Sequence, residues 1–195
     1  ERMTIGEMIA LFDIGGIGKS NAKFARDKLL AFNTQTAEQL AEITLLAAEE
    51  VQRFGMTPKV ALLSHSNFGS HDDESACKMR RVRQLLLERQ PELEVEGELQ
   101  ADAAFIEEIR HRAFPNSRLT GRANLFVMPN LDAANIVYNM VRVMTDGVAI
   151  GPILMGVSKP AHVLTPASTV RRVVNISAIA CVEAQIRAPR ESEKS

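Results

Sequence analysis

Short apolar runs of strand length alternate along this chain with longer segments whose apolar residues recur at the period of a helix. When strands and helices alternate, right-handed crossovers bring the strands into a parallel sheet and place helices on both of its faces. The sequence therefore predicts an α/β fold with a largely parallel sheet flanked by helices. We expect strands at residues 59–63, 95–99 and 124–128, and helices at 36–54, 73–90, 102–112, 131–144 and 168–187.

The first expected helix has clear start and stop signals. Thr36 and Gln39 stand three residues apart, which is the spacing of a capping box. Gly55 can adopt the left-handed conformation that ends a helix, and Pro58 cannot continue one. Later in the chain, residues 150–156 form a further apolar segment that glycine and proline punctuate.

Composition narrows the class of partner. At 195 residues the chain is long enough for one domain with a sizeable core. A net charge of −1 and an aromatic content of 5% argue against nucleic acid and against an anionic membrane. No apolar run reaches the roughly 20 residues that span a membrane. Cys77 and Cys181 lie in apolar helical patterns, so we expect buried structural thiols in a cytoplasmic protein.

The first 34 residues stand apart from the rest of the chain. Residues 13–20 end like a phosphate-binding loop, but that motif requires glycine where Asp13 stands and an apolar strand before it. We therefore expect a glycine-rich turn there and no nucleotide loop. The predicted organisation is a separate segment at 1–34, one domain at 35–187 and a charged tail at 188–195.

The loop at residues 64–70 carries the most chemistry. It follows an expected strand, and ligands of open α/β sheets bind at the carboxyl ends of strands. Three hydroxyls, an amide and a glycine precede a helix N-terminus, so one interpretation is an anion site for a phosphate or for coenzyme A. The other is a capped turn before a solvated basic face, which the acidic residues 72–74 favour. That face would consist of Lys78, Arg80, Arg81 and Arg83.

Other polar residues leave their roles open. Asp132 and Asn135 follow an expected strand, and they could line a cleft or cap the next helix. The four histidines share no metal-ligand spacing, so we expect no metal site. Of these, we expect His65 to serve in capping or surface hydrogen bonding. We interpret four methionines as core-filling side chains: Met128, Met140, Met144 and Met155.

Four segments resemble the phosphate acetyltransferase superfamily, and together they cover residues 35–187. They are LSHSNFGS at 63–70, EGELQAD at 96–102, LFVMPNLDAANIVYN at 125–139 and IGPILMGVSKP at 150–160. Details at 64–70, 159–166, 169–175 and 182–185 resemble one branch, the C-terminal domain of bacterial NADP-dependent malic enzymes. The resemblance implies a phosphate acetyltransferase-like fold of the isocitrate/isopropylmalate dehydrogenase type.

The resemblance also implies a regulatory and oligomerisation domain. Such a domain would form homo-oligomers and would bind acetyl-CoA or a related small metabolite allosterically. It would need no cofactor itself. Oxidative decarboxylation of malate to pyruvate, with NADP and Mg²⁺ or Mn²⁺, would take place in a region absent from this chain.

One departure from the active transferases concerns catalysis. Those enzymes carry a Ser-Arg pair followed by an Asp where this chain has Thr165, Pro166 and Arg172. Proline supplies no guanidinium, and arginine is no carboxylate base. We therefore expect no catalytic residue here, with an active phosphate acetyltransferase as the alternative. The expected ligand contacts are Ser64, Ser66, Asn67, Gly69 and Ser70 for an anionic group, and Asn130, Asn135, Lys159 and Thr165 along the rest of the cleft.

Overall fold

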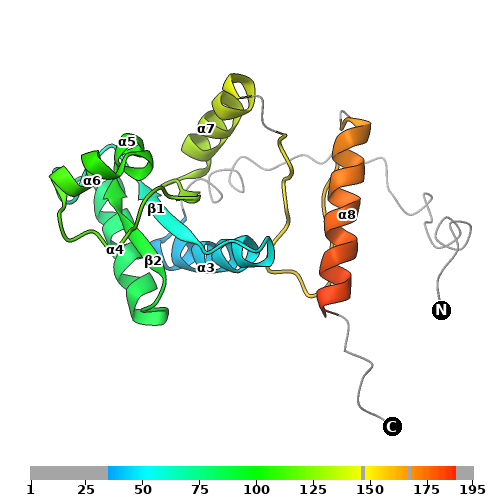
Figure 1. Cartoon of the computed structure of the whole chain (residues 1–195), viewed down its shortest axis with the longest axis horizontal. Coiled ribbons are helices and arrows are strands. Elements are labelled where there is room, and N and C mark those ends of the chain that lie inside the picture. The colour runs from blue at the N-terminus through cyan, green and yellow to red at the C-terminus, as the bar shows by residue number, and fades with distance from the viewer. Residues whose placement is uncertain (1–34, 146–147, 167, 188–195) are drawn as a thin grey trace, which may run out of the picture.

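The computed structural model describes residues 35–145, 148–166 and 168–187 (Figure 1). Its three strands form a parallel sheet in the order β2-β1-β3. Helices pack on both faces, which confirms the predicted α/β class. The elements are α3 (Ala37–Arg53), β1 (Lys59–Leu63), α4 (Glu74–Arg89), β2 (Glu94–Leu99), α5 (Ala101–Phe105), α6 (Glu107–Ala113), β3 (Leu125–Val127), α7 (Leu131–Met144) and α8 (Val170–Arg187).

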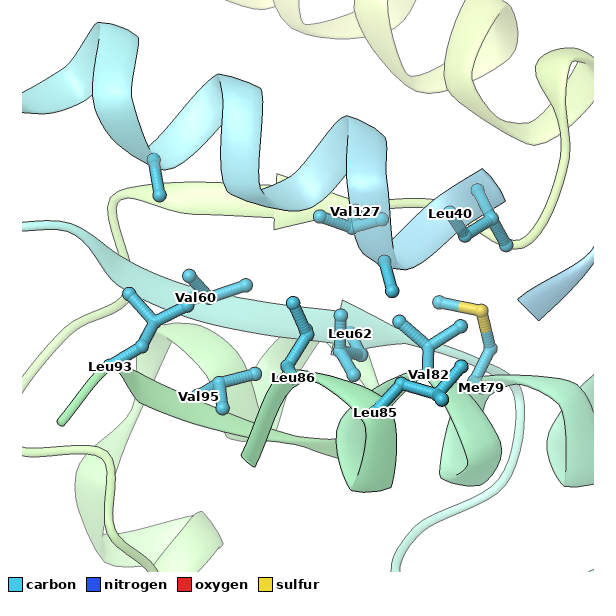
Figure 2. Close-up of a cluster of buried hydrophobic side chains, with 12 residues drawn as sticks. Leu40, Val60, Leu62, Met79, Val82, Leu85, Leu86, Leu93, Val95 and Val127 are labelled. Atoms are coloured by element: carbon cyan, nitrogen blue, oxygen red, sulfur yellow. The ribbon is translucent and has the colours of Figure 1, made fainter. Parts of the chain in front are cut away.

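One face of the sheet packs against α3 and α4. Alternate β1 residues, Val60 and Leu62, point to this face and meet Val82 and Leu86 of α4 (Figure 2). All four side chains are fully buried. Fully burying a side chain of this size contributes roughly 1.5–3 kcal/mol, so this layer contributes substantially to the stability of the described fold.

The other face packs against α5 and the chain that leads into β3. Ala61 of β1 lies in this second cluster with Leu99, Ala103 and Leu119. Small residues dominate here, so α5 approaches the sheet closely. The structure breaks the helix expected at 102–112 at Ile106, which has extended dihedral angles (φ −115°, ψ 107°). The expectation of one continuous helix was therefore wrong.

Local signals at the start of the domain are confirmed. The Thr36 side chain accepts a hydrogen bond from Gln39 N at 3.3 Å, and Gln39 Oε1 accepts from Thr36 N at 3.0 Å. Gly55 has a φ of 77°, as a helix-ending glycine requires. The phosphate-loop-like run at 13–20 and the tail at 188–195 lie outside the described residues.

The last two helices are far less covered than the sequence suggests. No residue of α7 is buried, and Met140 and Met144 are 55% and 77% exposed. The interpretation of these two methionines as core filling was therefore wrong. Between the two helices, residues 148–166 have no regular structure apart from turns and bends. None of the helices in the described ranges is long and apolar enough to cross a membrane.

Candidate functional site at the carboxyl edge of the sheet

The loop at 64–70 leaves the carboxyl end of β1 and folds over the end of β2. Ser64 N donates to Leu99 O, and Phe68 N donates to Glu98 O, each at 2.9 Å. Phe68 and Gly69 have positive φ values of 45° and 86°. These conformations let the chain reverse within a few residues, and the two backbone bonds hold the reversed loop against β2.

Glu98 lies at the centre of this loop. Its side chain is fully buried. Its Oε1 accepts hydrogen bonds from Ser66 Oγ at 2.7 Å, Gly69 N at 2.8 Å and Arg80 Nη1 at 3.2 Å. Its Oε2 is buried and has no hydrogen-bond partner within the described ranges. A carboxylate of the chain itself therefore accepts from donors that the sequence assigned to an external anion.

Arg80 and Arg83 of α4 turn toward buried carboxylates. Arg80 bonds Glu98 and also Asp72, whose Oδ1 lies 2.6 Å from Arg80 Nη2. Arg83 Nε donates to Glu96 Oε1 at 2.7 Å. The solvated basic face predicted as the alternative is thus absent at these two arginines. It does hold for the neighbouring Arg81, whose side chain is 46% exposed.

A cavity of about 250 Å³ adjoins these ion pairs. Gly97 backbone and the side chains of the two arginines form part of its lining. Another part is aromatic, because the rings of Phe68 and Phe114 are stacked with centroids 4.7 Å apart. The two carboxylates balance the two guanidinium groups, so the cavity carries no excess charge.

The five loop residues expected to contact an anion do lie together. Most of their polar atoms are already bonded to one another or to β2. Ser64 Oγ accepts from Ser66 N at 3.1 Å, and Ser70 Oγ accepts from Asn67 N at 3.0 Å. The Asn67 amide is bonded in both directions to Gln100, because Asn67 Nδ2 donates to Gln100 Oε1 and Gln100 N donates to Asn67 Oδ1. An added anion must therefore displace bonds that the loop already makes.

Asn130 lies at the same edge of the sheet, after β3. It is the N-cap of α7, since its Oδ1 accepts from Ala133 N at 2.9 Å. The sequence left Asp132 and Asn135 as candidates to cap this helix or to line a cleft, and the N-cap position itself is taken by Asn130. A second cavity of about 350 Å³ lies between Asn130 and the first turn of α4. Lys78 lines it, and its Nζ donates to Pro129 O at 2.7 Å.

The remaining expected contacts are not joined to this edge. Asn135 is exposed on α7, and its backbone carbonyl accepts from Asn139 Nδ2. Thr165 is exposed and bonds Ser168, with Thr165 N 3.2 Å from Ser168 Oγ. Lys159 is also exposed. Within the part of the chain that the structure describes, no hydrogen bond or ion pair connects these three residues to the loop at 64–70.

The acidic residue that opens α4 has a capping role. Asp73 Oδ1 accepts from Ser75 N at 3.0 Å and from Ala76 N at 3.2 Å. The hydrogen bond from Ala76 N is the main reason that the pKa of Asp73 lies below its ordinary value of 3.8, and nearby His65 lowers it further. His65 Nε2 lies 2.9 Å from Asp73 Oδ2. The surface role expected for His65 is thus the pairing of this capping carboxylate.

Sequence reasoning missed three charged side chains that the structure buries fully. Glu96 and Glu98 alternate with Val95 and Leu99, a pattern that usually indicates a strand with one solvated face. The structure buries both glutamates. Arg110 is also fully buried and donates to three backbone carbonyls. A sequence signal for the two glutamates was the group of arginines in the preceding helix, because Arg83 lies 13 residues before Glu96 and Arg80 lies 18 residues before Glu98.

Cys77 and Cys181 are both exposed, so the expectation of buried thiols was wrong. Cys77 Sγ accepts from Arg80 Nη2 at 3.1 Å. In the described ranges, no group of three or more His, Cys, Asp or Glu side chains is arranged to hold a metal ion.

A parallel α/β sheet with a polar loop and two cavities at its carboxyl edge has the arrangement in which open α/β folds bind ligands. Residues 25–181 match the family described as phosphate acetyl/butaryl transferase, and the chain belongs to this family. The match begins inside the segment at 1–34 that the sequence set apart.

Similar proteins fall into two groups. The chain is 59% identical over 150 residues to the NADP-dependent malic enzyme of Escherichia coli (strain K12), which covers 76% of this chain and 20% of that enzyme. It is 52% identical over 167 residues to the NAD-dependent malic enzyme of Rhizobium meliloti (86% of this chain, 22% of that enzyme). The phosphate acetyltransferase of Paracoccus denitrificans is 44% identical over 148 residues (75% and 46%). The chain thus spans about a fifth of the malic enzymes that it matches.

Solved structures agree with the family. A phosphotransacetylase from Streptococcus pyogenes superposes with a TM-score of 0.75 at 36% identity, over 79% of this chain and 47% of that one. EutD phosphotransacetylase from Staphylococcus aureus gives 0.73 at 33% identity, over 78% and 47%. The fold expected from the resemblance is therefore confirmed.

Proposed function

We propose that this chain is part of the phosphotransacetylase-like domain of a malic enzyme, and that it binds a metabolite and mediates assembly without transferring acetyl groups. The supporting observation is the identity of 59% to a malic enzyme, against 44% to a phosphate acetyltransferase over a similar length. Malate oxidation to pyruvate, with NADP and Mg²⁺ or Mn²⁺, would belong to a region outside this chain. We expect such a protein to work in the cytoplasm.

The residues at 165–172 support a domain without acetyl transfer. Thr165 replaces the expected serine, and its hydroxyl lies 3.5 Å from Ser168 Oγ. Pro166 has no cationic group to hold a phosphate. Arg172 is positively charged and cannot accept a proton from a thiol. The acid–base chemistry of the transfer therefore has no provider among these positions.

Lys78 supports binding of an anionic ligand at the carboxyl edge. Its ammonium has three protons and uses one of them on Pro129 O, so two remain for a ligand in the adjoining cavity. The N-terminus of α4 contributes partial positive charge to the same cavity. Asp73 and Glu74 also line it, which favours a ligand that combines an anionic group with hydrogen-bond donors. Acetyl-CoA or a related metabolite meets that description.

A paired assay separates binding from catalysis. Acetyl-CoA at about 100 times its Kd should stabilise the chain by about 2.7 kcal/mol, which appears as a higher melting temperature. Coenzyme A and acetyl phosphate serve as comparison ligands. The same preparation should form no acetyl-CoA from acetyl phosphate and coenzyme A. Acetyl transfer that disappears in Thr165→Ala would replace this proposal with an active phosphate acetyltransferase.

Assembly is tested separately from binding. Sedimentation velocity at several concentrations should detect a homo-oligomer of the chain. A monomer at all accessible concentrations, together with no thermal shift, would contradict both parts of the proposal.

A further inference from the structure

The two ion pairs beside the cavity of about 250 Å³ have their carboxylates inside and their guanidinium groups outside. The Glu96 and Glu98 side chains are 1% and 0% exposed, whereas those of Arg83 and Arg80 are 27% and 30% exposed. The net charge of the four groups is zero, but the exposed charges are positive. An accessible guanidinium N–H attracts an anion. The cavity therefore favours a ligand with a negatively charged group.

Arg83 is the arginine that keeps hydrogen-bonding capacity for a ligand. Its Nε donates to Glu96 Oε1 at 2.7 Å, and within the described residues its Nη1 and Nη2 donate no hydrogen bond. Arg80 is already occupied, because its two terminal amino groups donate to acceptors of the chain, among them Glu98 and Asp72. Two parallel N–H groups of a guanidinium match the two oxygens of a carboxylate. Arg83 can thus bind one carboxylate without giving up its bond to Glu96.

The aromatic part of the lining indicates the body of that ligand. The rings of Phe68 and Phe114 are half-buried, and they stack with an angle of 20° between their planes. A flat ring can extend such a stack. Drug-sized ligands occupy cavities of roughly 300–1,000 Å³, so a cavity of about 250 Å³ takes a smaller molecule. The zero net charge of the lining disfavours a multiply charged group such as a phosphate.

We propose that this cavity is a binding site for a small planar monocarboxylate. The carboxylate bonds Nη1 and Nη2 of Arg83, and the planar body lies against the ring of Phe114. The cavity shares no lining residue with the one beside Lys78. The proposal is therefore independent of the ligand proposed for that second cavity.

Benzoate is the probe, because it joins one carboxylate to one flat ring. In a nuclear magnetic resonance titration of the isotope-labelled chain, benzoate should shift the backbone amide signals of Gly69 and Gly97, which line the cavity. A ligand this small should give a Kd on the order of 1 mM. Benzamide has the same shape without the charge, and inorganic phosphate has charge without the ring. Each should bind roughly fivefold or more weakly than benzoate. The titration contains no acetyl-CoA, so its outcome does not depend on the other cavity.

Two variants test the two halves of the site. Arg83→Lys keeps a cation for Glu96 but removes the paired N–H groups, so it should weaken benzoate binding roughly fivefold or more. Phe114→Leu keeps an apolar side chain without a ring and should weaken it roughly twofold or more. Arg81→Lys makes the same change as Arg83→Lys at an exposed neighbour and should bind benzoate like the parent chain. The spectrum of each variant shows whether it is folded.

Shifts at both glycines that Arg83→Lys weakens, with Arg81→Lys unchanged, support the proposal. No shift at either glycine overturns it. Benzamide or phosphate binding as tight as that of benzoate overturns it as well, as does an equal effect of the two lysine variants. If Arg83→Lys does not fold, Phe114→Leu decides, because unchanged benzoate affinity in that variant contradicts the site and weakened affinity supports it.

Discussion

Ser66 Oγ donates a hydrogen bond to Glu98 Oε1 at 2.7 Å, and both residues are fully buried. The pair joins the β1–α4 loop to the end of β2, two segments about thirty residues apart. Because Gly69 N and Arg80 Nη1 also donate to the same oxygen, Glu98 serves as an internal anion for the loop. The conformation of this loop thus depends on a residue of the neighbouring strand.

Replacing Glu98 should destabilise the fold. Glu98→Ala leaves the buried Ser66 hydroxyl and Gly69 N–H without their acceptor, at a cost of about 2–4 kcal/mol. Glu98→Gln retains an acceptor oxygen and should cost less. Urea denaturation followed by circular dichroism measures both. Glu88→Ala, on the exposed side of α4, should stay within about 0.5 kcal/mol of the parent chain. Equal stabilities of the Glu98→Ala and Glu88→Ala chains would contradict the internal-anion role.

Arg110 should be required for the layer beneath the sheet. Its guanidinium donates to Ala103 O at 2.8 Å, Leu119 O at 3.0 Å and Gly121 O at 2.6 Å. Arg110→Met leaves these carbonyls without the donor and should cost about 3 kcal/mol. Arg110→Lys cannot span the three acceptors and should recover only part of the loss. The exposed Arg112→Met is the control, and an equal effect of the two methionine variants would refute this role.

Gly97 should tolerate no side chain. A Cβ there would lie 2.6 Å from Leu62 Cβ and 2.7 Å from Leu62 O, and its φ is 148°. Gly97→Ala must therefore separate β2 from β1, at a cost of roughly 3 kcal/mol or more. Gly55→Ala is the matched comparison, because Gly55 has a φ of 77° with nothing within 4 Å of an added Cβ. It should cost only about 1 kcal/mol. Thermal or urea unfolding of the two variants gives the comparison.

Asp73 should make the fold sensitive to acid. The hydrogen bond from Ala76 N lowers its folded-state pKa below 3.8. Its contribution is therefore fully present above the unfolded-state value and is lost as the pH falls through the folded-state pKa. Nuclear magnetic resonance titration of the Asp73 carboxyl carbon should give a midpoint below 3.8. Asp73→Asn keeps the cap and should remove this part of the acid dependence. A midpoint at or above 3.8 would contradict the capping geometry.

The helices and strands with strong local signals were predictable from sequence. The capping-box spacing of Thr36 and Gln39 predicted the start of α3, and the apolar run at 59–63 predicted the central strand β1. The break in the expected helix at Ile106 was not predictable, because the helical period of the apolar residues continues through this position. The packing of α5 against the sheet determines where the helix breaks. The exposure of apolar side chains on α7 and α8 was also not predictable. An apolar stripe predicts that a helix face is covered, but it does not say which segment covers it.

The place of the loop at 64–70 in the fold was predictable, but its bonding was not. The position of the loop at 64–70 follows from the rule that parallel sheets bind ligands at their carboxyl edge. Glu98, which accepts hydrogen bonds from this loop, lies on another strand. Because Glu98 alternates with apolar residues, the sequence pattern predicted a solvent-exposed side chain there. Lys159 and Thr165 came from family likeness alone, and in the described structure they are not connected to that loop.

Isothermal titration calorimetry with acetyl-CoA tests the central claim most directly. The chain should bind with a micromolar Kd, equivalent to about −8 kcal/mol. Lys78→Met should weaken this binding at least tenfold, because it removes the cation from the cavity beside Asn130. Arg89→Met, at the far end of α4, should bind like the parent chain. No heat from the parent chain, or equal affinity in Lys78→Met, would contradict the account.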